Sequence, residues 1–169
     1  MRPAPTELPF KFVTGTTNRE SLAGVRGAIE YYEWVRKTFG TPAADTRRAH
    51  IVAGVEAMEQ HNQMLAARLI AGLQAIDGVT VLGITDPAHL NRRVPTVSFC
   101  TDITTPGEIA QHMAEHGIYI WSGHNYGVEP CRLMGVLDKG CVVRVGPTHY
   151  NKPEEIDRFL ALLGEFLQG

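Results

Sequence analysis

Apolar residues in the first half of the chain recur every three or four positions, which is the spacing of an amphipathic helix. Thr17-Asn18-Arg19-Glu20 has the form of a capping box, in which the threonine hydroxyl and the glutamate satisfy free N–H groups of a new helix. Gly40 is a natural C-terminal stop, so a helix is predicted over about 18–39. Its apolar face consists of Leu22, Val25, Ile29 and Tyr32. Residues 1–14 contain three prolines and are predicted to be an extended connector.

A second helical region is longer. Thr41-Pro42 places a capping hydroxyl before a proline at the first helical position, and Asp77-Gly78 ends the pattern. The apolar positions between them are Ile51, Val55, Met58, Leu65, Leu69, Leu73 and Ile76. This region is much longer than an average helix, so a break near residue 45 or at Gly54 is expected.

After residue 78 the pattern changes to short runs rich in β-branched and aromatic residues, which are typical of strands. The four runs are 79–82, 96–99, 118–121 and 142–145. A capping box at Thr105–Glu108 opens a helix that ends at Gly117, and a final helix carries Ile156, Phe159, Leu160 and Leu163. This order predicts an α/β chain of α+β-like type: a small, mainly antiparallel sheet with helices on one face, preceded by a long helical arm.

Composition narrows the class of protein. The 169 residues are 44% hydrophobic with a formal net charge of -2, which allows one sizeable core. The basic residues form no block, so a nucleic-acid partner is not expected. No run approaches the roughly 20 apolar residues of a membrane helix, and the first residues lack the apolar stretch of a signal peptide, so a cytoplasmic location is expected. The three cysteines form no C-x-x-C pair and are expected to stay reduced and buried.

Gly15-Thr16-Thr17-Asn18 leads into a predicted helix N-terminus, where backbone N–H groups and the helix dipole favour an anion. A phosphate group fits this position. The alternative is that Thr17 only caps the helix. Both interpretations stay open on the local sequence.

Arg144 stands in the otherwise apolar run 142–145, where it either grips a carboxylate or forms a structural ion pair. The segment 122–127 follows a predicted strand and contains His124 and Tyr126 between glycines. Such a loop can move and carry acid–base chemistry, or it can be an exposed turn.

His112-Met113-Ala114-Glu115-His116 matches a zinc-binding H-x-x-E-H pattern, in which two histidines four apart bind the metal. A third ligand would be needed. The simpler interpretation is the solvent-facing edge of a helix, and no metal is expected. The zinc hydrolase stays as an alternative to be tested.

Taken in order, these pieces resemble a known family. They are a Gly-Thr before a helix, a long helical arm, a strand ending in a glycine-histidine loop, then Val-Arg-Val, His-Tyr-Asn and Glu-Glu-Ile-Asp. The chain is similar over nearly its whole length to the C-terminal third of class V aminotransferases. Within fold-type I pyridoxal phosphate enzymes, the nearest branch is the cysteine desulfurase-like one.

The resemblance implies roles for five residues. Gly15 and Thr16 would contact the phosphate of pyridoxal phosphate, often across a dimer interface, and Arg144 would hold the α-carboxylate of an amino-acid substrate. His124 and Tyr126 would lie in a mobile loop that closes over the substrate. Tyr126 stands near the place of the catalytic cysteine of desulfurases, which argues against persulfide chemistry.

Two further features follow from the resemblance. Trp121 replaces an arginine often found just before the loop, which suggests an altered substrate preference. The Schiff-base lysine and the other ring contacts of the family belong to a large domain upstream. None of the four lysines, Lys11, Lys37, Lys139 and Lys152, has the expected surroundings.

The predicted organisation is therefore a connector and helix over 1–40, continuing from a large domain, and a small C-terminal domain over 41–169. The chain would contribute to a transferase or lyase without being catalytically complete, and it would carry no catalytic residue of its own. A homodimer or a complementing N-terminal half would complete it. The alternative is a non-catalytic module of the same fold, used for dimerisation or partner binding.

Overall fold

The computed structural model describes residues 5–13, 15–42 and 45–169 of the chain. They form two compact units, Met1–Ala57 and Met58–Gly169, and the boundary between these units falls within the helix Arg47–Gln74. The predicted division at residue 40 stays a prediction. No helix in the described ranges is long and apolar enough to cross a membrane.

The first unit contains the 3-10 turn η1 (Phe10–Phe12), helix α1 (Arg19–Phe39) and the start of α2 (Arg47–Gln74). The predicted cap of α1 is wrong by one residue, because the side chain of Asn18, not Thr17, accepts a hydrogen bond from the Ser21 N–H at 2.9 Å. Gly40 ends α1 as predicted, with its N–H 3.0 Å from the Arg36 carbonyl.

The predicted start of the second helix at Thr41-Pro42 is also wrong. Helix α2 begins at Arg47, where the Thr46 hydroxyl accepts from the Ala49 N–H at 3.2 Å. The described residues between Gly40 and Arg47 are not helical, so a later start of the helix takes the place of the expected break near residue 45, and α2 passes through Gly54 without interruption.

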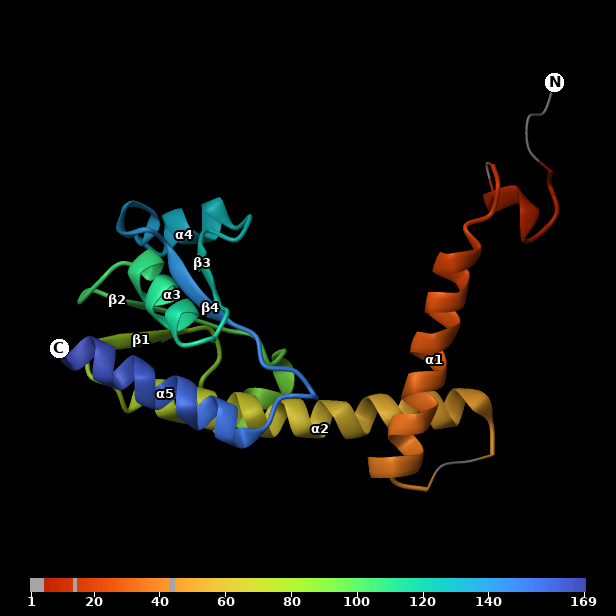
Figure 1. Ribbon diagram of the computed structural model, residues 1–169, viewed down its shortest axis with the longest axis horizontal. Coiled ribbons are helices and arrows are strands. Elements are labelled where there is room, and N and C mark those ends of the chain that lie inside the picture. The colour runs from red at the N-terminus through yellow and green to blue at the C-terminus, as the bar shows by residue number, and fades with distance from the viewer. Residues whose placement is uncertain (1–4, 14, 43–44) are drawn as a thin grey trace. The chain divides into compact units, whose positions relative to one another are not determined.

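The second unit contains a four-stranded antiparallel sheet in the order β1-β2-β4-β3, which confirms the predicted fold class (Figure 1). The strands are β1 (Val79–Leu82), β2 (Val97–Thr101), β3 (Trp121–Gly123) and β4 (Val142–Val145), and the turn η2 (Pro87–Arg92) joins β1 to β2. The predicted strand at 118–121 is wrong, because only residues 121–123 pair with β4. Residues 118–120 precede the ladder without pairing.

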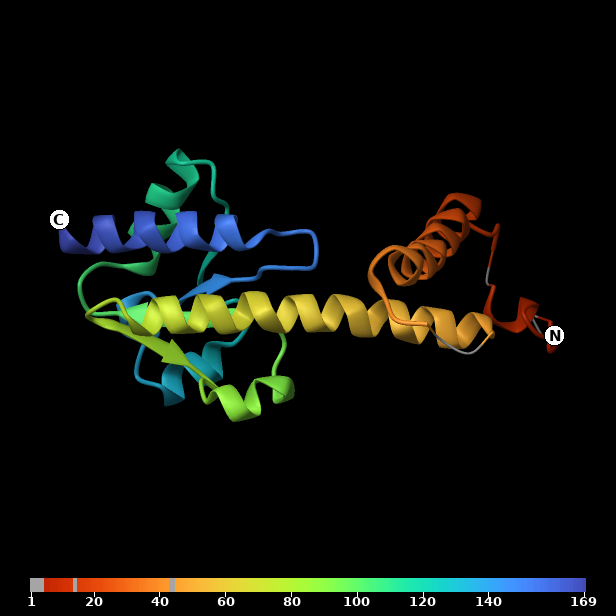
Figure 2. The ribbon, with the colours of Figure 1, turned by 90° about the horizontal axis from the view of Figure 1, so that it is seen from below.

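Three helices cover one face of the sheet: the C-terminal part of α2, α3 (Pro106–Glu115) and α5 (Pro153–Gln168). Figure 2 shows α2 and α5 side by side, and Arg68 of α2 donates two hydrogen bonds to Asp157 of α5, at 2.5 and 2.7 Å. The predicted Thr105–Glu108 capping box opens α3. The fully buried side chains of this core include Leu65, Leu69, Leu73, Phe99, Ile109, Met113, Val143 and Leu163.

The opposite face of the sheet is covered only in part. Helix α4 (Val128–Leu133) and the turn η3 (Leu137–Lys139) lie on the other side of the sheet from α5 (Figure 1). Their contacts form a small second cluster of Cys131, Val136, Cys141 and Val142, with Leu82, Cys100 and Leu137 packed against it. Successive residues of a strand face opposite sides, so Arg144 of β4 lies on the same face as buried Val142. Arg144 itself is only half-buried.

Candidate functional site

Arg144 lies in the middle of the sheet between two neighbours set by strand register. It pairs with Ser98 of β2 on one side and with Trp121 of β3 on the other. The guanidinium carbon lies 5.9 Å from the centroid of the Trp121 ring, within the range of a cation–π interaction. The indole ring of Trp121 therefore lies next to the guanidinium of Arg144.

The guanidinium of Arg144 has no carboxylate partner among the residues that the structure describes, and none of their hydrogen bonds involves it. Other basic residues of the same unit are engaged: Arg132 with Glu129, and Lys139 with Asp102 at 2.7 Å. The interpretation of Arg144 as a structural ion pair is thus unsupported in the described part of the chain. Its N–H groups are available to a ligand.

Arg144 lines a hollow of about 450 Å³. The other lining residues are Thr96, Tyr119, Ile120, Trp121 and Gly146. Arg93 holds the rim at Thr96, because its guanidinium donates to the carbonyls of Ile84 at 2.5 Å and of Thr96 at 2.9 Å. Burial lowers the pKa of Arg93.

The loop after β3 is a tight turn and does not line this hollow. Strand β3 already includes Ser122 and Gly123, so the loop is shorter than the predicted 122–127. The Tyr126 N–H donates to His124 Nδ1 at 3.1 Å, which fixes this nitrogen as the acceptor in the neutral ring. Asn125 and Tyr126 both have positive φ, 48° and 65°, and the Tyr126 side chain is fully exposed. Two left-handed residues in sequence make a strained, solvent-facing turn.

Gly15 and Thr16 are exposed residues of the first unit and precede α1. The Asn18 side chain accepts a hydrogen bond from the Ser21 N–H, and the Asn18 carbonyl accepts from the Leu22 N–H at 3.2 Å. No partner within the described residues is found for the N–H groups of Arg19 and Glu20 or for the Thr16 hydroxyl. These donors lie at the positive end of the α1 dipole, so the local chemistry suits an anion.

The H-x-x-E-H residues are engaged in packing. The His112 ring stacks on Phe166 with centroids 4.3 Å apart, and His116 Nδ1 donates to the His112 carbonyl at 2.9 Å. The described residues contain no group of three side chains that could hold a metal ion. The structure therefore gives the zinc alternative no support.

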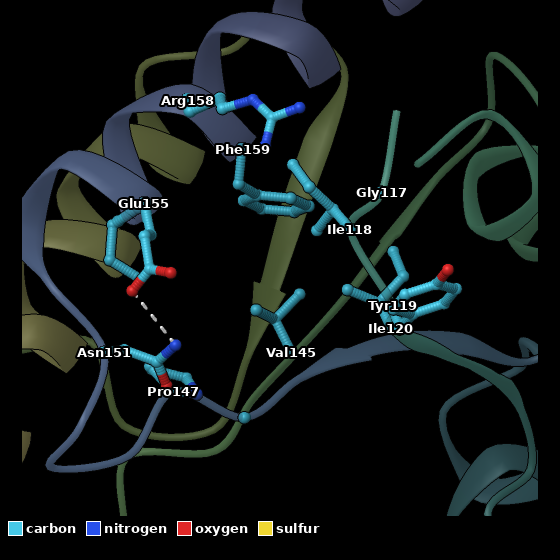
Figure 3. A pocket seen from close by; sticks show the side chains of 12 residues that line it. Gly117, Ile118, Tyr119, Ile120, Val145, Pro147, Asn151, Glu155, Arg158 and Phe159 are labelled. Carbon is cyan, nitrogen blue, oxygen red and sulfur yellow. Dashed lines mark hydrogen bonds between the residues drawn. The ribbon is translucent and has the colours of Figure 1, made fainter. Parts of the chain in front are cut away.

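The His-Tyr-Asn and Glu-Glu-Ile-Asp motifs build the turn from β4 to α5. Asn151 Oδ1 accepts from the Thr148 N–H at 2.9 Å, and its amide donates to Glu155 at 3.3 Å (Figure 3). Glu155 also accepts from the Lys152 N–H at 2.7 Å. These two bonds, the backbone one first, lower the pKa of Glu155.

A second cavity of about 230 Å³ lies between this turn and residues 117–120 (Figure 3). Phe159 and Val145 form its floor, and Arg158 donates to the His116 carbonyl at 2.5 Å. Residues 118–120 thus separate this cavity from the hollow beside Arg144, because Tyr119 and Ile120 line both. Gly117, which follows α3 and has a φ of 73°, is the one signal in the sequence for where this segment begins.

The thiols are poor nucleophiles. Cys131 and Cys141 are buried in the second cluster, and Cys100 is half-buried against it. Burial, and then hydrogen bonding to Cys131, raises the pKa of the Cys141 thiol, and burial also raises the pKa of Cys100. For Cys100, burial and the charge of Asp102 outweigh the opposing charge of Lys139, so neither environment favours a thiolate.

Comparison with solved structures defines the fold. The chain superimposes on a cysteine desulfurase from Thermococcus onnurineus NA1 with a TM-score of 0.73, covering 97% of this chain and 35% of that one at 24% identity. The fold is therefore that of part of a cysteine desulfurase, as the sequence resemblance predicts.

Relatives by sequence agree with this fold. A probable cysteine desulfurase of Xylella fastidiosa (strain 9a5c) is 30% identical over 155 residues, 92% of this chain and 31% of that protein. An aminotransferase-like protein of Gibberella zeae is 36% identical over 115 residues, 64% of this chain and 27% of that protein. Residues 4–159 match the profile of the class V aminotransferases, and the chain belongs to this family. It spans about a third of the length of the curated relatives it matches.

Proposed function

We propose that the chain is the C-terminal part of a pyridoxal phosphate-dependent enzyme that acts on an amino acid, and that Arg144 binds the α-carboxylate of this substrate. The observation that carries the proposal is the guanidinium of Arg144, which faces an open hollow without a carboxylate partner among the described residues. The planar N–H fork of an arginine matches a carboxylate in two parallel hydrogen bonds. Membership of the class V aminotransferases supports an amino acid as the ligand.

The residues before α1 fit the phosphate end of the cofactor. Gly15 offers an unobstructed backbone, since a Cβ there would meet no atom within 4 Å, and Thr16 offers an exposed hydroxyl beside the helix N-terminus. Pyridoxal phosphate, when bound, supplies the electron sink for chemistry at the α-carbon.

Two of the four lysines, Lys139 and Lys11, have surroundings that do not fit a covalent bond to the cofactor. Lys139 is paired with Asp102, and this contact raises its pKa, whereas a Schiff-base lysine needs a lowered one. Lys11 lies over the Phe12 ring on the exposed N-terminal segment. In the proposed enzyme, the covalent attachment belongs to a part outside this chain.

A homodimer or a complementing N-terminal half would complete the enzyme. In this arrangement residues 1–40 continue from the large domain, and residues 41–169 form the small domain that orients the substrate. His124 and Tyr126 would reach the substrate only through a movement of the turn after β3, which does not line the hollow beside Arg144; the side chain of Tyr126 is fully exposed. Three reduced cysteines suit the cytoplasm.

The first experiment is a titration of the ¹⁵N-labelled chain with L-alanine, followed by NMR at the Arg144 Nε–H. Binding should shift this signal, and Arg144→Gln should abolish the binding. Arg132→Gln is the matched control, because Arg132 is an arginine of the same unit that is already paired with Glu129. If L-alanine leaves the Arg144 signal unchanged, the carboxylate role is wrong. Borohydride reduction with pyridoxal phosphate should give no specific lysine adduct.

A non-catalytic dimerisation module is the second candidate, and one observation favours it. Helix α1 exposes large apolar side chains, among them Leu22, Val25 and Phe39, the last 71% exposed. Such a face needs a partner. Light scattering of the chain without cofactor distinguishes the two: a stable dimer that binds no amino acid favours the module.

A further inference from the structure

The wall of the hollow beside Arg144 is aromatic on one side. Trp121 is 68% exposed and Tyr119 is 86% exposed, and both line the hollow. They stand two positions apart in the chain, with Trp121 at the start of β3 and Tyr119 just before it. Two large rings therefore present apolar surface to solvent next to a free cation.

The contact between Arg144 and Trp121 leaves the arginine able to bind a carboxylate. A guanidinium meets an aromatic ring across its flat face, whereas it donates hydrogen bonds to a carboxylate from its edge. An indole on the flat face and a carboxylate at the edge can thus be held by Arg144 at the same time. A ligand can occupy the edge of the guanidinium and still reach the exposed part of the ring.

The remaining lining restricts the rest of the ligand. Among the described residues that line the hollow, Arg144 is the one charged residue, and the others are Thr96, Tyr119, Ile120, Trp121 and Gly146. A charged substrate side chain would find no counter-ion there. A thiol substrate would find no acceptor thiol, because Cys131 and Cys141 are buried and the turn 124–127 has no cysteine.

From this arrangement we infer that the substrate is an amino acid with an aromatic side chain, bound by its carboxylate at Arg144 and by its ring against Trp121 and Tyr119. The inference rests on the proposed function, since it takes Arg144 as the carboxylate ligand. The hollow of about 450 Å³ lies in the range of roughly 300–1,000 Å³ that is usual for small-molecule sites. Trp121 and Tyr119 are then specificity-determining residues.

The test compares four probes on the full chain by NMR titration: L-phenylalanine, L-leucine, L-cysteine and L-alanine. Ring stacking should make L-phenylalanine bind about two- to tenfold more tightly than L-alanine. L-cysteine should bind like L-alanine. The indole N–H of Trp121 should shift with L-phenylalanine, whereas that of Trp34, the other tryptophan, should not.

Variants test whether Trp121 causes the preference for L-phenylalanine. Trp121→Ala should reduce the ratio of the L-phenylalanine and L-alanine affinities to about one while L-alanine still shifts Arg144. Trp34→Ala, in the other unit, should keep the wild-type ratio. If the amide spectrum of Trp121→Ala loses its dispersion, this variant is not folded, and Trp121→Leu is used in its place. The ratio of the L-phenylalanine and L-alanine affinities of Trp121→Leu should be below the wild-type ratio, because leucine has no flat ring.

The possible outcomes distinguish a failure of the aromatic preference from a failure of the proposed function. Equal binding of L-phenylalanine and L-alanine at Arg144 overturns the aromatic preference and leaves the proposed function standing. Equal binding of L-leucine and L-phenylalanine also overturns it, in favour of any apolar side chain. A lack of any shift at Arg144 with all four probes refutes the proposed function itself.

Discussion

The packing of α1 on the start of α2 depends on a single glycine. A Cβ built on Gly54 would lie 2.1 Å from the carbonyl oxygen of Tyr32 and 3.0 Å from its carbonyl carbon. Ordinary contacts begin at 3.4 Å, so the two helices would have to separate by more than an ångström. Both atoms belong to the backbone, which cannot turn aside as a side chain can. We therefore expect Gly54→Ala to undock α1.

The size of the effect follows from two opposing contributions. Overpacking costs about 1–3 kcal/mol, and a backbone overlap belongs at the upper end. Alanine favours a helix over glycine by about 1 kcal/mol. The net loss for Gly54→Ala is then about 1–2 kcal/mol. Gly24→Ala is the matched control, because Gly24 lies in α1 with no atom within 4 Å of its added Cβ, and it should stabilise α1 by up to about 1 kcal/mol.

Hydrogen exchange followed by mass spectrometry measures this at the amides of residues 19–39. A change of 1.4 kcal/mol corresponds to a tenfold change in an equilibrium constant, so Gly54→Ala should speed exchange by about five- to thirtyfold. Gly24→Ala should slow it. The reasoning is refuted if Gly54→Ala slows exchange to the same extent as Gly24→Ala. The Gly15–Thr16 segment precedes α1, so the docking of α1 also bears on the proposed phosphate contact.

Three further predictions concern the second unit. Hydrogen bonds from the Thr104 hydroxyl and from Thr105 lower the pKa of Glu108 to about 2, against an ordinary 4.5, so its contribution to stability should be present above pH 4.5 and lost as the pH falls toward 2. The melting temperatures of wild type and Glu108→Gln should therefore converge as the pH falls over that range. A difference that stays constant with pH would contradict the role of the Glu108 carboxylate in the cap. Asn151→Ala should lower the free energy of unfolding in urea by about 1–2 kcal/mol and should raise the pKa of Glu155 in an NMR titration. An unchanged pKa would show that the Asn151 amide does not lower the pKa of Glu155. Gly164→Ala in α5 should raise the free energy of unfolding by up to about 1 kcal/mol, since no atom lies within 4 Å of the added Cβ, and a loss of stability would show an unrecognised contact.

Local chemistry was enough to predict some elements to the residue. The β-branched runs at 79–82 and 142–145 are strands with those bounds, because every residue of β1 pairs with β2 and every residue of β4 pairs with β2 or β3. The cap of α1 was misplaced because threonine and asparagine are both good N-caps, and tertiary geometry decides between neighbours. The apolar run at 118–121 was misassigned for a different reason. Its β-branched and aromatic residues favour a strand, but a strand also requires a hydrogen-bonding partner, and only residues 121–123 pair with β4.

The candidate site was predictable only in part. Arg144 was identifiable because a charged residue in an apolar strand needs a partner or a ligand. Thr96 and Tyr119 were not, since they reach Arg144 through the strand order β1-β2-β4-β3, which places β4 between two strands that precede it in the chain. No local pattern encodes that order. The sequence also could not show that Arg144 lacks an ion-pair partner, because any of its eighteen acidic residues was a candidate.

The two faces of β4 explain why an arginine is tolerated there. Val143 and Val145 face the main core, and Val142 and Arg144 face the other side. Helix α4 and η3 cover Val142 with the cysteine cluster, and Arg144 lies outside that cluster. Covering an unpaired guanidinium would cost several kcal/mol, whereas an open hollow keeps it hydrated. The limited extent of α4 therefore explains why an arginine is tolerated in the middle of the sheet, and it leaves Arg144 accessible for the carboxylate role that we propose.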